Sequence, residues 1–198
     1  KYHWTPVGSI ANYLAKPEVA PKHSAPSEYH IVANAQHAID AAIAVAQQEG
    51  WKTKVLGYDI QGEAREVAKA HAQQALACRA NGERVMLFSG GELTVTVGKE
   101  YGDGGPNQEY LMALALELNG VEGISAMACD TDGVDGSKDV AGAYIDSSTL
   151  HRAVAAGVSA TELLASHNSH EFFGAIDDLV ITGPTNTNVN DFRAIIIE

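Results

Sequence analysis

From residue 29 onwards, the sequence alternates short apolar runs with longer segments of helical periodicity, and this alternation most constrains the fold. Segment 35–50 shows the helical pattern clearly, because apolar residues recur in it at i, i+3, i+4 and i+7 from Ile39. Strands that alternate with helices of roughly 10–15 residues are typical of a sheet covered by helices on both faces. We therefore expect an α/β fold, namely a three-layer α/β/α sandwich with a mixed, mainly parallel sheet.

The pattern predicts the individual elements as follows. Strands are expected at 29–35, 51–60, 84–91, 93–98, 123–130, 141–146, 177–183 and 193–198. Helices are expected at 35–50, 62–78, 107–118, 147–157 and 159–167. The strands 84–91 and 93–98 are predicted to pair around a Gly90–Gly91 turn. The helix 107–118 is apolar on nearly all sides, which indicates burial on both.

The N-terminal residues differ from the rest in composition. Four of the six prolines lie within the first 26 residues, so residues 1–28 are predicted to form an irregular arm with a short helix near 10–15. Residues 29–198 are predicted to form a single α/β domain, which is long enough to bury a sizeable core.

Charge and cysteine content exclude several classes of protein. The chain has 13 Lys and Arg against 25 Asp and Glu, a formal net charge of −12, which argues against nucleic acid or an anionic membrane as a partner. No apolar run approaches the roughly 20 residues that span a bilayer. The two cysteines, Cys78 and Cys129, are far apart in the sequence and are expected to be reduced thiols of a cytoplasmic protein.

Glycine-rich polar motifs follow the predicted strands. They are SGGE (89–92), DTDGVDG (130–136) and GPTNTNVND (183–191), while GDGGPNQE (102–109) leads into a helix. In open α/β sheets ligands bind outside the carboxyl ends of strands. Backbone N–H groups of glycine turns and helix starts can face an anion there, and the side-chain amides of Asn107 and Gln108 could add to them. The alternative is that each glycine pair only makes a hairpin turn.

The acidic loop after residue 129 is a candidate metal site. An EF-hand requires a carboxylate at its fifth position, where this loop has Val134, so calcium of that type is disfavoured. Mg²⁺ needs only one or two carboxylates together with waters and phosphate oxygens, which Asp130, Asp132 or Asp135 could supply. The alternative is a turn in which these aspartates accept hydrogen bonds from neighbouring N–H groups.

Other motifs carry less weight. His167 and His170, followed by Glu171, lack a visible further ligand for zinc. Ser89 lacks the G-x-S-x-G context of a nucleophile, and the chain has neither a P-loop nor a dinucleotide-binding glycine fingerprint. Asn34 is expected to cap the helix that follows it.

The motifs FSGGELTVTV, GDGGPNQEYLMALALEL, ACDTDGVDGSKDVAGAYID and ITGPTNTNVNDF, in this order, resemble the MOFRL family. That family is the C-terminal part of class II glycerate kinases, relatives of which are also labelled hydroxypyruvate reductases. The resemblance covers about residues 85–198, and segment 32–72 resembles the part of those enzymes just upstream.

The resemblance implies ATP- and Mg²⁺-dependent phosphorylation of D-glycerate in a cleft between two α/β domains, of which a kinase domain on the N-terminal side is the second. Asp130 and Asp132 would then be catalytic, and Asp132 and Asp135 would hold the metal. The residues implied to bind substrate or phosphate are Ser89, Gly90, Gly91, Glu92, Gly104, Gly105, Asn107, Gln108, Thr131, Gly133, Thr185 and Asn188.

The sequence departs from the family pattern at two positions. Many relatives have Arg where this chain has Pro106, which puts a catalytic cation from this loop in doubt, and relatives often have Gly where Asn186 stands. Two other functions stay open: an NAD(P)H-dependent hydroxypyruvate reductase, or a non-catalytic domain for small-anion binding or assembly. The sequence also leaves a homodimer open.

Overall fold

The computed structural model describes residues 7–16, 28 and 30–198. The chain divides into two units, 1–32 and 33–198, which are considered separately. In the described part of the first unit, helix α1 (Gly8–Leu14) has no buried residue. Its position agrees with the short helix predicted near 10–15.

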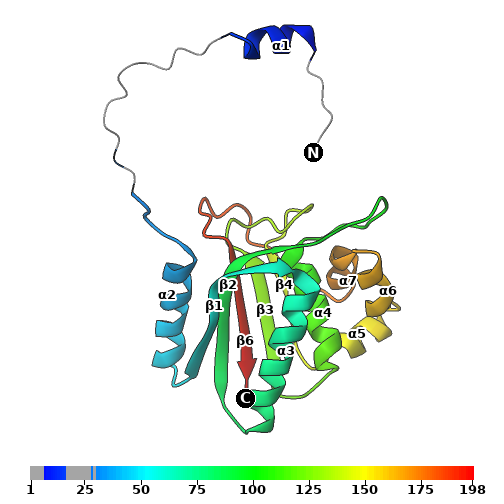
Figure 1. Cartoon of the computed structure of the whole chain (residues 1–198). Helices are drawn as coiled ribbons and strands as arrows, with labels where there is room; N and C mark the ends of the chain where they lie inside the picture. Colours follow the sequence, from blue (N-terminus) through cyan, green and yellow to red (C-terminus); the bar gives the residue numbers. More distant parts are fainter. Residues whose placement is uncertain (1–6, 17–27, 29) are drawn as a thin grey trace. The chain divides into compact units, whose positions relative to one another are not determined.

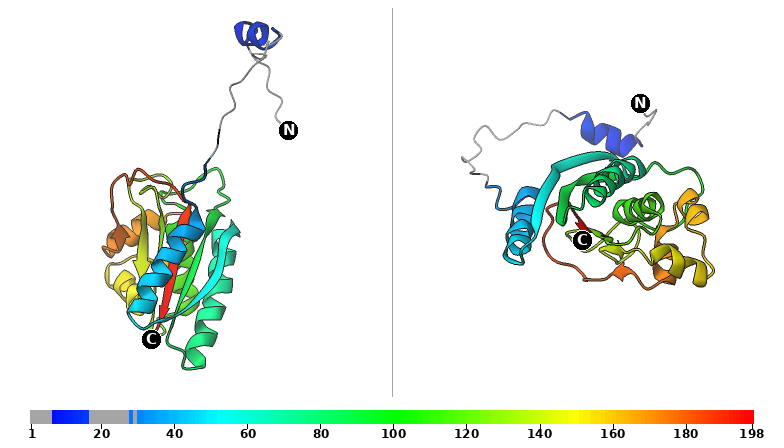
Figure 2. Two further views of the ribbon diagram at one scale, coloured as in Figure 1. Left: turned by 90° about the vertical axis from the view of Figure 1, so that its left-hand side faces the viewer. Right: turned by 90° about the horizontal axis from the view of Figure 1, so that it is seen from below.

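The second unit is a six-stranded sheet between two helical layers, as Figures 1 and 2 show. Its strands are β1 (Lys52–Glu63), β2 (Val85–Thr94), β3 (Ile124–Asp130), β4 (Gly142–Ile145), β5 (Leu179–Val180) and β6 (Asp191–Ile197). Its helices are α2 (Ala35–Gln48), α3 (Ala64–Ala80), α4 (Pro106–Leu118), α5 (Thr149–Ala155), α6 (Ala160–Ala165) and α7 (Ser169–Ala175). The predicted α/β class and the mixed sheet are confirmed.

The strand order is β1-β2-β6-β3-β4-β5, and only the β1–β2 pair is parallel within the described residues. The expectation of a mainly parallel sheet was therefore wrong at the level of neighbouring pairs. The reason is that β6, the last strand, enters between β2 and β3 and runs against both. The strands β1, β2 and β3 nevertheless all point the same way, so their carboxyl ends lie at one edge of the sheet, at the top of Figure 1.

The helices cover the two faces unequally. Helix α2 packs on one face through a small apolar cluster of Ile39, Ala46 and Phe88. Helices α3 and α4 cover the other face and enclose the main core, with α5, α6 and α7 beside α4 (Figure 1). Helix α4 is buried on nearly all sides, as its composition predicts. Among the described residues, no helix is both long enough and apolar enough to cross a bilayer.

Several elements differ from the prediction. Residues 30–34 form no strand, and Tyr29 lies outside the described residues; Asn34 instead caps α2 by accepting from the His37 N–H at 3.2 Å. Helix α7 was not expected, and the strand predicted at 177–183 is reduced to β5. Cys78 and Cys129 are both unpaired.

The predicted hairpin at Gly90–Gly91 was also wrong, because β2 is continuous through both glycines. These glycines allow the backbone of β1 to pass close to β2. A Cβ on Gly91 would lie 2.1 Å from the carbonyl oxygen of Ile60, and one on Gly90 would lie 2.9 Å from that of Tyr58. Gly91 also has φ +112°, a conformation that residues with a side chain rarely adopt. The two glycines are therefore required for close strand packing.

Replacing Gly91 with Ala should accordingly lower the free energy of unfolding by about 3 kcal/mol, because the methyl group adds both a backbone clash and a strained φ. Urea denaturation measures the change. Gly98→Ala is the matched control, since a Cβ there meets no atom within 4 Å. Equal stability of the two variants would contradict the explanation.

Candidate functional site

The four glycine-rich motifs meet at the edge where β1, β2 and β3 end and β6 begins. Helix α4 starts at the same edge, because residue 107 at its first turn contacts both the acidic loop and Asp191 of β6. Figure 1 shows these loops together along the upper rim of the second unit. The common location that the sequence predicts for them is therefore observed.

The centre of this edge is a buried carboxylate at the start of α4. Asp135 is 1% exposed and accepts hydrogen bonds from the backbone N–H groups of Asn107 and Gln108, at 3.0 and 2.9 Å. The side-chain amides of the same two residues donate to it as well, at 3.3 and 3.0 Å. Burial raises the pKa of Asp135, and these hydrogen bonds act against the rise.

This arrangement corrects two expectations. The helix start was expected to offer N–H groups to an external anion, but a carboxylate of the chain itself occupies them. Asp135 was also expected to hold a metal, yet each of its oxygens already accepts two hydrogen bonds, which fills the acceptor sites of a carboxylate. Asn107 and Gln108 are fully buried, so their amides face the interior rather than a ligand.

Asp135→Asn should destabilise the chain by about 2–3 kcal/mol, because an amide nitrogen would then face the donors of residues 107 and 108. Chemical denaturation followed by circular dichroism measures the loss. Asp139→Asn, at an exposed position of the same loop, should stay within about 0.5 kcal/mol of the parent chain. A stable Asp135→Asn variant would show that the carboxylate does not hold the helix start.

A second buried group, Arg193 on β6, lies beside this centre. Its guanidinium donates to Asp191 at 2.7 Å and to the carbonyl oxygen of Gly90 at 2.8 Å, and Nε lies 3.3 Å from Ser89 Oγ. Asp191 in turn accepts from the Asn107 amide at 2.7 Å. Arg193 is 1% exposed, so it ties β2, β6 and α4 together and offers no charge to a ligand at the surface.

The sequence contains an indication of the Asp191–Arg193 ion pair that the analysis of motifs did not use. Asp191 and Arg193 stand two residues apart in β6, on the face that also carries Ile195 and Ile197. A charged pair in phase with buried isoleucines indicates an ion pair inside the protein rather than in a loop.

His71 and Tyr110 continue the buried polar network under Arg193. His71 Nδ1 lies 2.9 Å from the Tyr110 hydroxyl, and the Arg193 guanidinium is 5.7 Å from the tyrosine ring centre. Burial, with a smaller contribution from the Arg193 charge, lowers the pKa of His71 from 6.5 to about 4. His71 is therefore neutral in the folded chain at neutral pH.

Stability should depend on pH through His71. The unfolded chain binds a proton at this histidine below pH 6.5, whereas the folded chain does not until about pH 4, so the free energy of unfolding falls as the pH falls between these values. The loss attributable to this group is about 3 kcal/mol. Urea titrations of the parent and of His71→Gln at several pH values measure this loss. If the free energy of unfolding depends equally on pH in the two proteins, the assignment to His71 is contradicted.

The acidic loop and the loop before β6 are joined by hydrogen bonds. The Thr131 hydroxyl donates to the carbonyl oxygen of Asn190 at 2.7 Å, and the Thr185 hydroxyl donates to that of Thr131 at 2.6 Å. Gly133 is buried where the two loops pack, since a Cβ there would lie 2.3 Å from the Gly183 carbonyl oxygen. Four predicted ligand-binding residues (Thr131, Gly133, Thr185 and Asn188) therefore belong to one double loop.

Asp130 and Asp132 are the carboxylates that this double loop places together. Asp132 donates its N–H to Asp130 Oδ1 at 3.1 Å, while its own carboxylate accepts from Val134 N–H at 2.8 Å and from the Asn188 amide at 3.2 Å. Burial raises the pKa of Asp130 to about 6, and the charges of Asp132 and Asp191 contribute to the rise.

The two carboxylates fit Mg²⁺ only in part. A divalent ion would relieve the repulsion that contributes, after burial, to the raised pKa of Asp130, and Mg²⁺ needs few carboxylates when phosphate and water complete its shell. Across the described ranges, however, no three His, Cys, Asp or Glu side chains converge as a metal site. That result also gives no support to zinc at His167, whose Nδ1 lies 3.0 Å from Glu109 Oε1.

Two cavities open at this edge. The larger, of about 450 Å³, is polar and is lined by the start of α2 and the ends of β1 and β2, including Asp59, Gly91, Glu92 and Asn190. The smaller, of about 220 Å³, is mostly apolar and is lined by the chain that follows β2 and by Gly104, Gly105 and Glu109. The predicted site residues are thus divided, with Gly91 and Glu92 at one cavity and Gly104 and Gly105 at the other.

A comparison with protein families places residues 85–191 in a known group. The chain belongs to the MOFRL family. Pro106, one of the two expected departures from the family pattern, is the first residue of α4, a position that suits proline. Asn186, the other expected departure, has φ +58°, in the left-handed region that Asn tolerates.

Similar proteins carry two kinds of name. A protein of Agrobacterium vitis, provisionally named a hydroxypyruvate reductase, is 45% identical over 86% of this MOFRL chain and 46% of its own length. The D-glycerate 2-kinase of Thermotoga maritima is 35% identical over 86% of this chain and 42% of its own. The crystal structure of a glycerate kinase from Thermotoga maritima matches with a TM-score of 0.84 at 31% identity, over 96% of this chain and 49% of that one. The chain therefore spans less than half the length of these relatives.

Proposed function

We propose that this chain is the C-terminal MOFRL part of a cytoplasmic glycerate kinase, and that its loop edge forms one wall of the site where ATP phosphorylates D-glycerate. The observation that carries the proposal is the Asp130–Asp132 pair, which stands at the edge where all four family motifs meet. The kinase names of the Thermotoga relatives and the TM-score of 0.84 support it.

In this proposal the two aspartates have different roles. The carboxylate of Asp132 lies at the surface, where hydrogen bonds from the Val134 N–H and the Asn188 amide fix its position. It would hold Mg²⁺ together with phosphate oxygens and water. The ion supplies charge neutralisation for the phosphoryl group that is transferred. Asp130, whose raised pKa of about 6 lies closer to neutrality than an ordinary carboxyl, would orient the glycerate hydroxyl and accept its proton.

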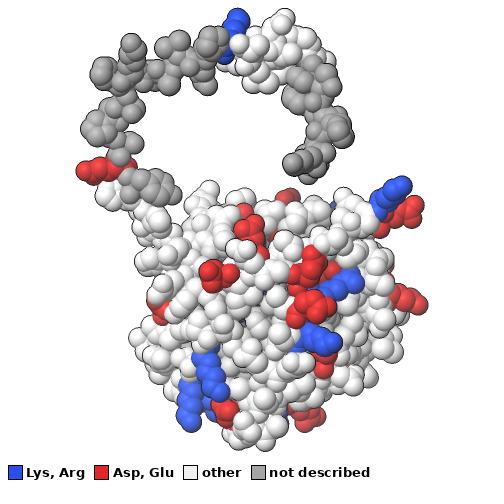
Figure 3. Space-filling view, in the orientation of Figure 1, with Lys and Arg blue, Asp and Glu red and all other residues white. Residues whose placement is uncertain are grey.

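The wall formed by this chain is poor in cations, although phosphoryl transfer requires them. Lys138 is paired with Asp103 at 3.0 Å, and Arg193 is buried. Figure 3 shows no continuous basic patch on the face that it draws. We infer that the cations come from a further domain, which corresponds to the part of the longer relatives that this chain does not cover. A homodimer remains a prediction.

The test is ADP release from ATP by the natural full-length protein, with and without D-glycerate and Mg²⁺. The proposal requires that all three be needed and that phosphoglycerate appear in equal amount. Oxidation of NAD(P)H by hydroxypyruvate, with no ADP formed, would instead favour the reductase named among the Agrobacterium relatives. Absence of both activities would favour a non-catalytic domain.

Asp132→Asn should lower kcat by about 100-fold or more in that assay, because one charge that positions Mg²⁺ and phosphate is removed. Its fold should persist, since an amide oxygen can still accept the Val134 N–H. Asp139→Asn, an exposed aspartate of the same loop, should leave kcat unchanged. Wild-type turnover by Asp132→Asn would remove this aspartate from the reaction.

A further inference from the structure

The smaller cavity has apolar walls and a charged floor. Val95, Val97 and Tyr101 line it from the segment that follows β2, and Pro106 lines it from the start of α4. Tyr101 is 62% exposed, so its ring stands at the mouth of the cavity. A cavity with mostly apolar walls accepts a largely apolar group better than a phosphate or a hydroxy acid.

The floor contains a buried carboxylate that is held in place from two sides. Glu109 is 3% exposed, and Arg65 donates to its Oε1 at 2.7 Å. His167 Nδ1 lies 3.0 Å from the same oxygen and 3.1 Å from Oε2, and it is also 2.9 Å from Arg65 Nη2. In one tautomer His167 donates to Glu109, and in the other it accepts from Arg65.

The arrangement leaves Glu109 with acceptor capacity. A carboxylate offers about four lone-pair sites. Arg65 and His167 both contact Oε1, whereas His167 alone among the described residues contacts Oε2. A donor that enters the cavity therefore meets an acceptor, whereas a carbonyl oxygen in the same place would face a negative charge. The charge of the floor thus selects for a ring that carries an N–H donor on its edge.

We propose that this cavity binds the adenine base of the nucleotide, with its exocyclic amino group directed at Glu109. The proposal rests on the proposed kinase function for the presence of a nucleotide. Val95 and Val97 would contact the faces of the ring, and Tyr101 would stack against it at the mouth. A guanine or hypoxanthine base would bring a carbonyl oxygen to Glu109 and bind more weakly.

The position of the cavity fits the remainder of a nucleotide. Gly136 and Ser137 of the acidic loop line its rim. Asp132 lies four residues before Gly136 in the sequence, so the two Cα atoms are at most about 14 Å apart. A nucleoside triphosphate can span that distance, which would bring its phosphates to the Asp130–Asp132 pair.

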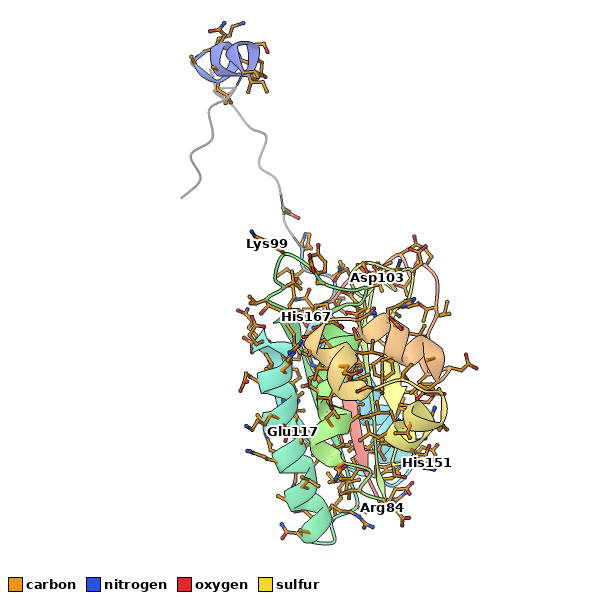
Figure 4. The ribbon with its side chains drawn as sticks, turned by 90° about the vertical axis from the view of Figure 1, so that its right-hand side faces the viewer. Arg84, Lys99, Asp103, Glu117, His151 and His167 are labelled. Atoms are coloured by element: carbon orange, nitrogen blue, oxygen red, sulfur yellow. The ribbon has the colours of Figure 1, made fainter. Side chains whose placement is uncertain are left out.

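The loop over the cavity is attached to the helices beside it. Gly102 N–H donates to the Ser166 carbonyl oxygen at 2.9 Å, and Asp103 N–H donates to the Asn168 side chain at 3.2 Å. Figure 4 shows His167 below the loop that carries Lys99 and Asp103. The loop that lines the cavity is thus hydrogen-bonded to the segment that carries His167. The larger cavity, lined by Asp59 and Glu92, has the polar character that suits hydroxyl groups instead.

The test uses nucleosides, which lack phosphate and so report on the base alone. Adenosine should bind the natural full-length protein in calorimetric titration, and inosine, which has a carbonyl oxygen in place of the amino group, should bind at least about 10-fold more weakly. Equal affinities of the two nucleosides, or no adenosine binding at millimolar concentration, would overturn the proposal.

A matched pair of variants locates the site. Val97→Trp fills the cavity and should weaken adenosine binding at least about 10-fold. Val55→Trp is the control, because Val55 is 37% exposed against 40% for Val97 and does not line the cavity. Adenosine affinities that are the same in both variants would place the base elsewhere.

The two proposals can fail separately. Equal turnover of ATP and GTP with D-glycerate by the full-length protein would overturn the adenine site and leave the kinase intact. Selective adenosine binding that Val97→Trp removes, in a protein without glycerate-dependent ADP release, would support the site and overturn the kinase.

Discussion

The structure of the loop edge depends on one contact, the buried Asp135 carboxylate at the start of α4. A carboxylate this deeply buried is costly unless hydrogen bonds compensate for lost water, and four donors from residues 107 and 108 do so. The contact fixes the acidic loop against the central helix. Through the Asn107 amide it also reaches Asp191, and from there Arg193 and β2. The positions of Asp130 and Asp132 at the surface follow from this buried framework.

Much of the fold could be predicted from local pattern, because helices and strands with one buried face have a clear periodicity. Helix α2 with its Asn34 cap, and α4 with its apolar surface, appear where the pattern places them. Strand pairing is different, since it depends on contacts between distant residues. Nothing local in residues 191–197 shows that this last strand enters the middle of the sheet.

The glycines show the same division between local and distant information. A Gly-Gly pair between two β-rich runs is a sound local signal for a turn, yet Gly90 and Gly91 lie inside one strand because β1 passes too close for a side chain. Likewise, the common edge of the four motifs could be predicted from strand direction, but the inward orientation of Asn107, Gln108 and Asp135 could not. The identity of a polar residue near a predicted site does not show whether its side chain binds a ligand or contacts another loop. Arg65 belonged to no motif, Glu109 only ended the GDGGPNQE motif, and His167 was considered only as a zinc ligand. These three residues come together only through the packing of α3, α4 and the chain before α7.

The central place of β6 has a consequence for how the molecule assembles. Until Ile197 has been synthesised, β1–β2 and β3–β4–β5 have no hydrogen-bonded connection through the sheet, because β6 is the strand that pairs with both β2 and β3. The two halves therefore leave the ribosome with unpaired inner strand edges that are exposed to other chains. Closure of the sheet therefore follows the synthesis of the other five strands, and it brings Asp191 and Arg193 into the network in the same step.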